Sequence, residues 1–283
     1  IEIHQSNDAS LIRRQDEDFA AADLREALRT NRLELYTQPI VSLRDRNHPL
    51  GFELLLRLRG ASGNIEDPGR MLAAAQRYQM LPMVDRYVVD KAFAILAPHR
   101  EVLQRQRLTM AINVSGQSIC DPEFAEHFTT QLRRSKLPAG CIVVEVTEQV
   151  ATTNLARAGD AMRRLRAAGC GIAIDDFGTG ANSLAYIHQL PVTRLKIDGS
   201  FIRDITANKR SEAAVRTIVQ LARDFVLQTV GEYVETQQQS EALRRLGVDF
   251  GQGYLFGKPE PLDATVATLV ERETAGGSIY STG

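Results

Sequence analysis

The stretch GIAIDDFGTG, residues 171–180, joins a short apolar run to two adjacent carboxylates and a loop that contains glycines. The apolar run 172–174 is typical of a buried strand, and Asp175 and Asp176 stand where that strand ends. Neighbouring like charges raise each other's energy unless something positive lies between them. The stretch therefore predicts the end of a buried strand, with a positive group beside its two carboxylates.

Similar apolar runs recur along the chain, and helical patterns separate them. The eight expected strands cover residues 33–41, 51–58, 108–115, 141–148, 170–176, 193–198, 227–235 and 250–257. Helical spacing of apolar residues occurs in 69–80, 83–97, 154–168 and 211–226, and a lead-in helix is expected near 16–30. Strands alternating with helices over roughly 250 residues favour an α/β fold, a TIM-type (β/α)8 barrel. A doubly wound sheet is the alternative, but nothing like GxGxxG follows the first strand.

The charge balance of the chain is nearly neutral. The 283 residues include 34 Lys and Arg against 35 Asp and Glu, which predicts neither a nucleic-acid polymer nor a membrane surface as partner. No apolar stretch approaches the roughly 18–20 residues that a membrane span needs. We therefore expect a globular domain without membrane contact by this segment. The three cysteines show no CxxC or zinc-ligand spacing and are interpreted as buried free thiols, which predicts the cytoplasm.

Polar side chains lie at the ends of seven of the eight expected strands. They are Glu53, Asn113, Glu145, Asp175 with Asp176, Lys196, Glu232 and Gln252. An unpaired carboxylate among apolar neighbours costs several kcal/mol or stays protonated. Each residue alone has an ordinary structural explanation, such as a salt bridge or a helix cap. The reactive groups of such barrels come from the carboxyl ends of several strands. Seven strand ends that each bring a polar side chain to the same rim therefore indicate a functional site.

The chemistry of this set favours hard divalent cations. Five carboxylates, two carboxamides and one lysine, without histidine or cysteine, suit Mg²⁺ or Mn²⁺ better than zinc. Two cations would explain the adjacent carboxylates, because Asp175 could bridge them while Asp176 serves one. Paired metals suit hydrolysis of a phosphodiester, and Lys196 can hold the attacking water or neutralise charge in the transition state.

Eight stretches, in order over about residues 30–262, together resemble the EAL domain family of cyclic di-GMP phosphodiesterases. They are YTQPIV, ELLLR, INVS, EVTE, DDFGTG, LPVTRLKID, GEYVE and GQGYLFGKP. The resemblance implies a barrel with one reversed strand, two Mg²⁺ or Mn²⁺ ions, and hydrolysis of cyclic di-GMP to linear 5′-pGpG. It also implies a bacterial second-messenger role and a homodimer.

Roles of individual residues follow from the same resemblance. One metal would be held by Glu53, Asn113, Glu145 and Asp175, and the other by Asp175, Asp176 and Glu232. Glu53 and Glu232 would also belong to the catalytic set, together with Lys196 at the nucleophilic water and Gln252, which orders the site. The substrate would contact Gln38, Leu55, Arg57 and Asp198.

The loop after Asp176 has its own expected role. In the family a glutamate, here Glu148, anchors this loop and links the metal site to a dimer contact. The loop residues concerned are Phe177, Gly178, Thr179 and Gly180. Its glycines suit a segment that rearranges, although a plain loop is the simpler reading.

Three departures from the family pattern leave alternatives open. Leu54 stands for the alanine of the Glu-Ala-Leu triplet, which should alter packing more than chemistry. Tyr233 stands for a glycine beside Glu232; if the backbone needs a positive φ there, Glu232 could be displaced. Ala181 and Asn182 replace Tyr-Ser in the loop. The alternative to a hydrolase is a receptor that binds cyclic di-GMP without cutting it, and a third class is a barrel enzyme for another phosphodiester.

The expected domain organisation has three parts. Residues 1–18 resemble the end of a preceding GGDEF domain or a linker, residues 19–274 form the barrel, and residues 275–283 form a flexible tail. We therefore expect a tandem parent protein, whose upstream regions would decide any membrane anchoring.

Overall fold

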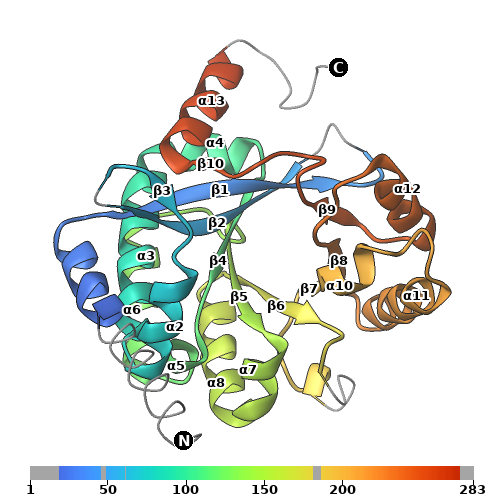
Figure 1. The fold of residues 1–283 in the computed structure, drawn as a ribbon, viewed down its shortest axis with the longest axis horizontal. Coiled ribbons are helices and arrows are strands. Elements are labelled where there is room, and N and C mark those ends of the chain that lie inside the picture. The colour runs from blue at the N-terminus through green and yellow to red at the C-terminus, as the bar shows by residue number, and fades with distance from the viewer. Residues whose placement is uncertain (1–18, 46–48, 61, 181–185, 275–283) are drawn as a thin grey trace, which may run out of the picture.

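The computed structural model describes residues 19–45, 49–60, 62–180 and 186–274. Within them, eight strands close into a barrel with helices outside it (Figure 1). The barrel strands are β1 (Leu33–Ser42), β2 (Pro49–Arg59), β4 (Thr109–Asn113), β5 (Ile142–Thr147), β6 (Gly171–Phe177), β7 (Arg194–Ile197), β8 (Gln228–Gly231) and β9 (Phe250–Gln252). Strand β1 runs antiparallel to both β2 and β9, and the other neighbours are parallel. The expected TIM-type barrel with one reversed strand is confirmed.

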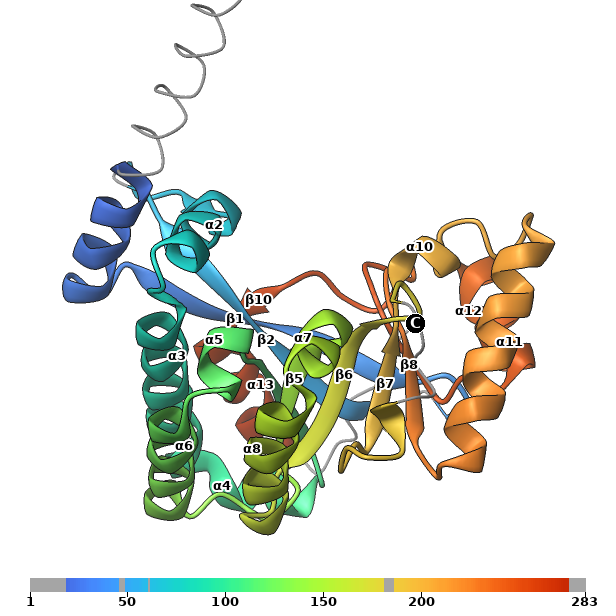
Figure 2. The same cartoon turned by 90° about the horizontal axis from the view of Figure 1, so that it is seen from below.

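The helices cover the outside of the barrel. They are a helix at 19–29, α2 (Gly69–Arg77), α3 (Leu81–Leu96), α4 (Arg100–Arg105), α5 (Gly116–Ile119), α6 (Pro122–Ser135), α7 (Glu148–Thr153), α8 (Leu155–Ala167), α10 (Gly199–Ile202), α11 (Lys209–Asp224), α12 (Gln237–Leu246) and α13 (Leu262–Thr274). Figure 2 shows α3, α6 and α8 on one side of the strands and α11 and α12 on the other. Among the described residues, none of these helices combines the length and the apolar character that crossing a membrane requires. Two short strands, β3 (Ile65–Glu66) and β10 (Glu260–Pro261), extend the sheet at its edges.

The core lies between the strands and the helices. All four residues of β7 and the first five of β5 are buried, as expected for parallel strands covered on both faces. Small side chains of Ala111, Val143 and Ala173 fill part of the barrel interior, while the main apolar cluster joins strands to helices. This packing fixes the strands whose ends carry the polar side chains.

Two expected strands were predicted too long. Strand β8 ends at Gly231 rather than at 235, and β9 ends at Gln252 rather than at 257. Tyr233 has φ 52° and Gly253 has φ 155°, so the backbone leaves the extended conformation there. A Cβ on Gly253 would lie 2.2 Å from the carbonyl oxygen of Val234, so the apolar residues after Gln252 form a tight turn instead of a strand.

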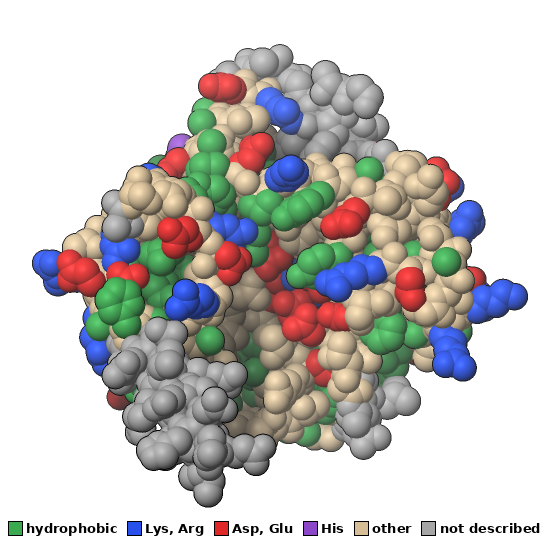
Figure 3. Space-filling view, viewed as in Figure 1, with side chains coloured by type: hydrophobic (Ala, Val, Ile, Leu, Met, Phe, Trp, Pro, Cys, Tyr) green, Lys and Arg blue, Asp and Glu red, His purple; other side chains and the backbone are tan. Residues whose placement is uncertain are grey.

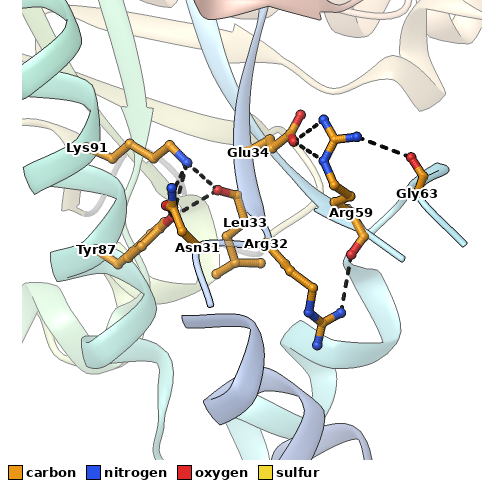
Figure 4. A network of polar contacts seen from close by, with 8 residues as sticks. All are labelled: Asn31, Arg32, Leu33, Glu34, Arg59, Gly63, Tyr87 and Lys91. Carbon is orange, nitrogen blue, oxygen red and sulfur yellow. Dashed lines mark hydrogen bonds and ion pairs between the residues drawn. The ribbon is translucent and has the colours of Figure 1, made fainter. Parts of the chain in front are cut away.

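A polar network fixes the start of β1 (Figure 4). Lys91 Nζ donates to the carbonyl oxygen of Leu33 at 2.6 Å, and the hydroxyl of Tyr87 donates to the same oxygen at 3.0 Å. On the other side, Arg32 donates to the carbonyl oxygen of Arg59 at 3.2 Å. Helix α3 and β2 therefore hold the first strand from both sides, which sets the register of the reversed strand against Glu53.

Candidate active site

The barrel brings the predicted strand-end residues together at one rim. Glu53 of β2 lies level with Ala111 of β4, and Asn113 of β4 lies level with Glu145 of β5. Because β4 to β9 are parallel, the residues at their carboxyl ends face the same opening. Figure 3 shows acidic side chains gathered in the hollow at the centre of this face, with basic and apolar side chains along its border.

Lys196 lies at the centre of the acidic cluster. Its Nζ contacts one carboxylate oxygen of each of four residues: Glu145 at 2.9 Å, Asp175 at 3.0 Å, Glu232 at 3.0 Å and Glu53 at 3.3 Å. The side chain is 1% exposed. Burial alone would lower the pKa of Lys196, but Glu145 and the other carboxylates outweigh it and raise that pKa well above its ordinary value. The lysine is therefore a permanent cation at the centre of the site.

Glu53 is the most completely hydrogen-bonded carboxylate of the cluster. It accepts from Gln252 Nε2 at 2.6 Å and from Asn113 Nδ2 at 2.5 Å, in addition to Lys196. Burial favours the neutral form of Glu53, yet the ammonium of Lys196 and these hydrogen bonds outweigh it and lower its pKa. Glu53 therefore stays ionised in the working pH range.

The other carboxylates carry more negative charge than one lysine can balance. Burial, opposed by Lys196 but aided by Glu53 and Asp175, raises the pKa of Glu145 to about 8. Burial and the neighbouring Asp175 raise the pKa of Asp176 to about 6. Burial also raises the pKa of Glu232 well above its ordinary value. Without further positive charge, Glu145 and Glu232 hold protons at neutral pH, and Asp176 takes one up below about pH 6.

The residues present fit divalent cations. Carboxylate oxygens of Asp175, Asp176 and Glu232 lie within 4.8 Å of one another, a spacing that can hold one ion. Two buried acceptors of this rim have no hydrogen-bond donor among the residues that the structure describes: Glu145 Oε1 and Gln252 Oε1. Buried acceptors of this kind need a partner, and an all-oxygen set is what Mg²⁺ and Mn²⁺ prefer.

Leu54 and Tyr233, two of the departures from the family pattern, leave the acidic cluster in place. Leu54 is 3% exposed and packs in the main core, away from Glu53. Tyr233 does take a positive φ of 52°, but Glu232 still reaches Lys196 at 3.0 Å. Ala181 and Asn182 lie outside the described residues.

Three of the residues expected to contact substrate come from two paired strands, Gln38 from β1 and Leu55 and Arg57 from β2. Gln38 accepts from Gln252 at 3.3 Å and donates to the carbonyl oxygen of Gly257 at 3.1 Å. Arg57 lies four residues after Glu53 on β2, on the same face of the strand and close to half-buried Leu55. Its guanidinium carbon is 6.0 Å from the centre of the Tyr36 ring. It makes no ion pair with the carboxylates of the cluster among the described residues.

Asp198 has a structural role in addition to its place beside Asp176. Its side chain accepts from the backbone N–H of Ser200 at 2.9 Å and caps helix α10. Its charge contributes to the raised pKa of Asp176, after burial and Asp175. Asp198 therefore borders the acidic cluster without belonging to the contacts of Lys196.

Glu148 holds the first part of the loop after β6. Its Oε2 accepts from the backbone N–H groups of Gly178 at 2.9 Å and Gly180 at 3.0 Å. The hydroxyl of Tyr186 donates to Oε1 at 2.7 Å. Phe177 is buried, and Thr179 turns back to donate to the carbonyl oxygen of Asp176 at 3.0 Å. The loop after Asp176 is thus tied to the first turn of α7.

Sequence reasoning missed several residues of this region. Tyr186 is 38 residues from Glu148, so no local pattern joins them. Arg194 lies two residues before Lys196 on β7 and is 4% exposed. Its Nε and Nη1 make no hydrogen bond among the described residues. Burial lowers the pKa of Arg194 to about 10. The period-2 spacing of a strand predicts that both side chains face the barrel interior. Arg203, beside the ring of Tyr233, carried no signal in the sequence.

Comparison with known proteins adds independent evidence. Residues 21–259 match the EAL domain. Over 262 residues the chain is 34% identical to the cyclic di-GMP phosphodiesterase PdeB of Shewanella oneidensis, covering 93% of this chain and 30% of that protein. Over 265 residues it is 36% identical to the cyclic di-GMP phosphodiesterase PdeF of Escherichia coli, covering 93% and 35%. The chain therefore spans about a third of the length of these relatives.

Solved structures of similar fold include ligand complexes. The PaMucR phosphodiesterase in complex with c-di-GMP superimposes with a TM-score of 0.80 at 32% identity, covering 87% of this chain and 99% of that one. The EAL enzyme Bd1971, in its cAMP- and cyclic-di-GMP-bound form, gives 0.85 at 28% identity, covering 95% and 73%. The match over residues 21–259, together with these structures, shows that the chain belongs to the EAL domain family.

Proposed function

We propose that this chain is a phosphodiesterase that hydrolyses cyclic di-GMP to linear 5′-pGpG with two Mg²⁺ or Mn²⁺ ions. The observation that carries the proposal is the buried rim in which four carboxylates surround Lys196 while two oxygen acceptors, Glu145 Oε1 and Gln252 Oε1, lack a donor within the described part of the chain. The named activities of PdeB and PdeF support the choice of substrate.

We propose the two ligand sets expected from the sequence; the close spacing of the Asp175, Asp176 and Glu232 oxygens supports the second of them. One ion would be held by Glu53, Asn113, Glu145 and Asp175, and the other by Asp175, Asp176 and Glu232. Two such ions would polarise the phosphate and activate a water. Metal binding would displace the protons that Glu145 and Glu232 hold at neutral pH in its absence, and the one that Asp176 holds below about pH 6.

The chain's own groups complete the reaction. Because Lys196 stays protonated, it donates N–H groups to the attacking water and to the phosphoryl oxygens but does not act as a base. An ionised carboxylate of the rim accepts the proton of the water. The new P–O bond forms as the P–O3′ bond breaks, and the ribose 3′ oxygen takes up a proton. Arg57 would hold the other phosphate from the rim, while Gln252 fixes Glu53.

The remaining expectations are proposals of the same standing. The barrel at 19–274 would be one domain of a longer cytoplasmic signalling protein. The loop held by Glu148 would couple the site to a homodimer contact. Gln38, Leu55 and Asp198 would border the bound dinucleotide.

The test is incubation of the purified chain with cyclic di-GMP and Mg²⁺ or Mn²⁺, with the products separated by chromatography. We expect pGpG, no product in EDTA, and loss of turnover in Glu53→Gln and Lys196→Ala. Glu34→Gln is the matched control, because Glu34 is a carboxylate of the neighbouring strand that pairs with Arg59 at the surface. Binding without product would instead support a cyclic di-GMP receptor, and neither binding nor product would reject the substrate.

A further inference from the structure

Tyr233 and Arg203 form an exposed pair at the mouth of the acidic cluster. Tyr233 directly follows Glu232, and its side chain is 54% exposed. The guanidinium carbon of Arg203 lies 5.1 Å from the centre of the tyrosine ring, within the range of a cation–π contact. Arg203 stands at the end of α10, the short helix that follows Lys196 and β7.

The backbone at Tyr233 is held in a conformation that a tyrosine adopts only at a cost. Its φ of 52° lies in the left-handed region that favours glycine. A ring that remains more than half exposed gains little from burial in return. Strain of this kind, beside reactive groups, points to a role in function.

Gly199 supplies the space for this ring. A Cβ at Gly199 would lie 2.2 Å from Cδ2 of Tyr233, so any larger residue there would displace the ring. The segments after β7 and β8 are therefore matched to each other: one omits a side chain where the other places an aromatic ring. Arg203 and Gly199 together hold the ring in one position.

We propose that Tyr233, held by Arg203 and Gly199, stacks on a guanine base of the bound dinucleotide and selects purine-containing substrates. This inference rests on the proposed function. The phosphate that reacts must lie at Asp175, Asp176 and Glu232, and Tyr233 is the side chain next along the chain from Glu232. Bases stack on aromatic rings, and the arginine guanidinium adds positive charge for an anionic ligand.

Kinetics separates stacking from a structural role. Removing one stacked base contact weakens binding by roughly 5- to 150-fold. We expect KM for cyclic di-GMP to rise within that range in Tyr233→Ala and Tyr233→Gly, with kcat changed far less, and to stay within about threefold in Tyr233→Phe. Tyr233→Gly relieves the positive φ, so a folding defect does not account for its result. Mn²⁺ affinity should be unchanged in all three variants, because Glu232 stays in place in each of them. A variant that displaced Glu232 would instead bind Mn²⁺ more weakly.

A fluorescence measurement tests the position of the base directly. The sequence contains no tryptophan, so Tyr233→Trp introduces a single reporter at the mouth. Guanine stacked on it should quench its emission as cyclic di-GMP is added. The matched control is Phe225→Trp, at the C-terminal end of α11 and therefore at the opposite end of the barrel, where Phe225 is 38% exposed; its emission should not change.

The outcomes distinguish the two proposals. If the wild-type chain cleaves cyclic di-GMP but Tyr233→Ala keeps its KM, or the reporter at 233 is not quenched, stacking at this residue is refuted and the proposed function stands. If the wild-type chain neither binds nor cleaves cyclic di-GMP, the proposed function is refuted, and the proposed stacking on Tyr233 is refuted with it.

Discussion

Replacing Lys196 by methionine should weaken the fold and strengthen cation binding at the same time. The substitution keeps an unbranched side chain, one heavy atom shorter, and removes a charge that contacts four carboxylates at 2.9–3.3 Å. Leaving buried charges without their partner costs about 3–5 kcal/mol. We therefore expect the free energy of unfolding in EDTA at pH 8 to fall by that amount, and by less at pH 5, where the carboxylates can take up protons.

The affinity for cations should change in the opposite direction. The ammonium of Lys196 contacts Asp175 and Glu232, two of the three residues that can hold one ion. Two unit charges about 4 Å apart interact by about 4 kcal/mol at an effective dielectric constant of about 20. Removing the ammonium should therefore tighten Mn²⁺ binding at least about tenfold, although the variant no longer turns over substrate.

Urea unfolding and Mn²⁺ calorimetry check both halves of this prediction. The control is Lys91→Met, because Lys91 donates to the carbonyl oxygen of Leu33 at 2.6 Å and lies outside the cluster. It should lose stability without any change in Mn²⁺ affinity. Weaker Mn²⁺ binding in Lys196→Met, or unfolding unchanged from wild type, would refute the reasoning that the lysine balances the carboxylates in place of a cation.

Three further outcomes follow from the same structure. Because the pKa of Glu145 is raised to about 8 and that of Asp176 to about 6, Mn²⁺ affinity should rise from pH 6 to pH 9 with release of protons; calorimetry in buffers of different ionisation enthalpy measures this, and a pH-independent affinity would oppose it. Glu148→Gln should lower turnover by about 10- to 100-fold with Mn²⁺ affinity retained, measured by product formation; full activity would show that the loop needs no such anchor. Asp85→Ala removes the buried acceptor for two donors after β4 and should cost about 2–4 kcal/mol in urea unfolding, whereas Asp90→Ala, at an exposed partner of a histidine, should cost far less.

The sequence predicted the rim because each contributing residue carries a local signal. Glu145 between two valines, and Lys196 between a leucine and an isoleucine, are polar residues inside apolar runs. The alternation of helices and strands then places the strand ends together. Both steps depend on neighbours in the sequence, so the eight strands and the set of rim residues could be predicted without coordinates.

The rest depends on contacts that no local pattern encodes. The hydroxyl of Tyr186 reaches Glu148 across 38 positions, and Lys196 reaches Glu53 across 143. Strands β8 and β9 were predicted too long because apolar residues continue beyond them, whereas the positive φ values of Tyr233 and Gly253 end each one. The partnership of Tyr233 with Arg203 arises only when the segments after β7 and β8 lie side by side.

The central claim is that the carboxylate rim is a two-metal centre for cyclic di-GMP hydrolysis, with Asp175 shared by both ions. The most direct test counts Mn²⁺ bound per chain by equilibrium dialysis and follows pGpG formation in the same samples, for the wild-type chain and Asp175→Asn. For the wild-type chain we predict two bound ions and metal-dependent product. For Asp175→Asn we predict that the chain no longer binds two ions and forms no product. Turnover that persists in Asp175→Asn or in excess EDTA would contradict the claim.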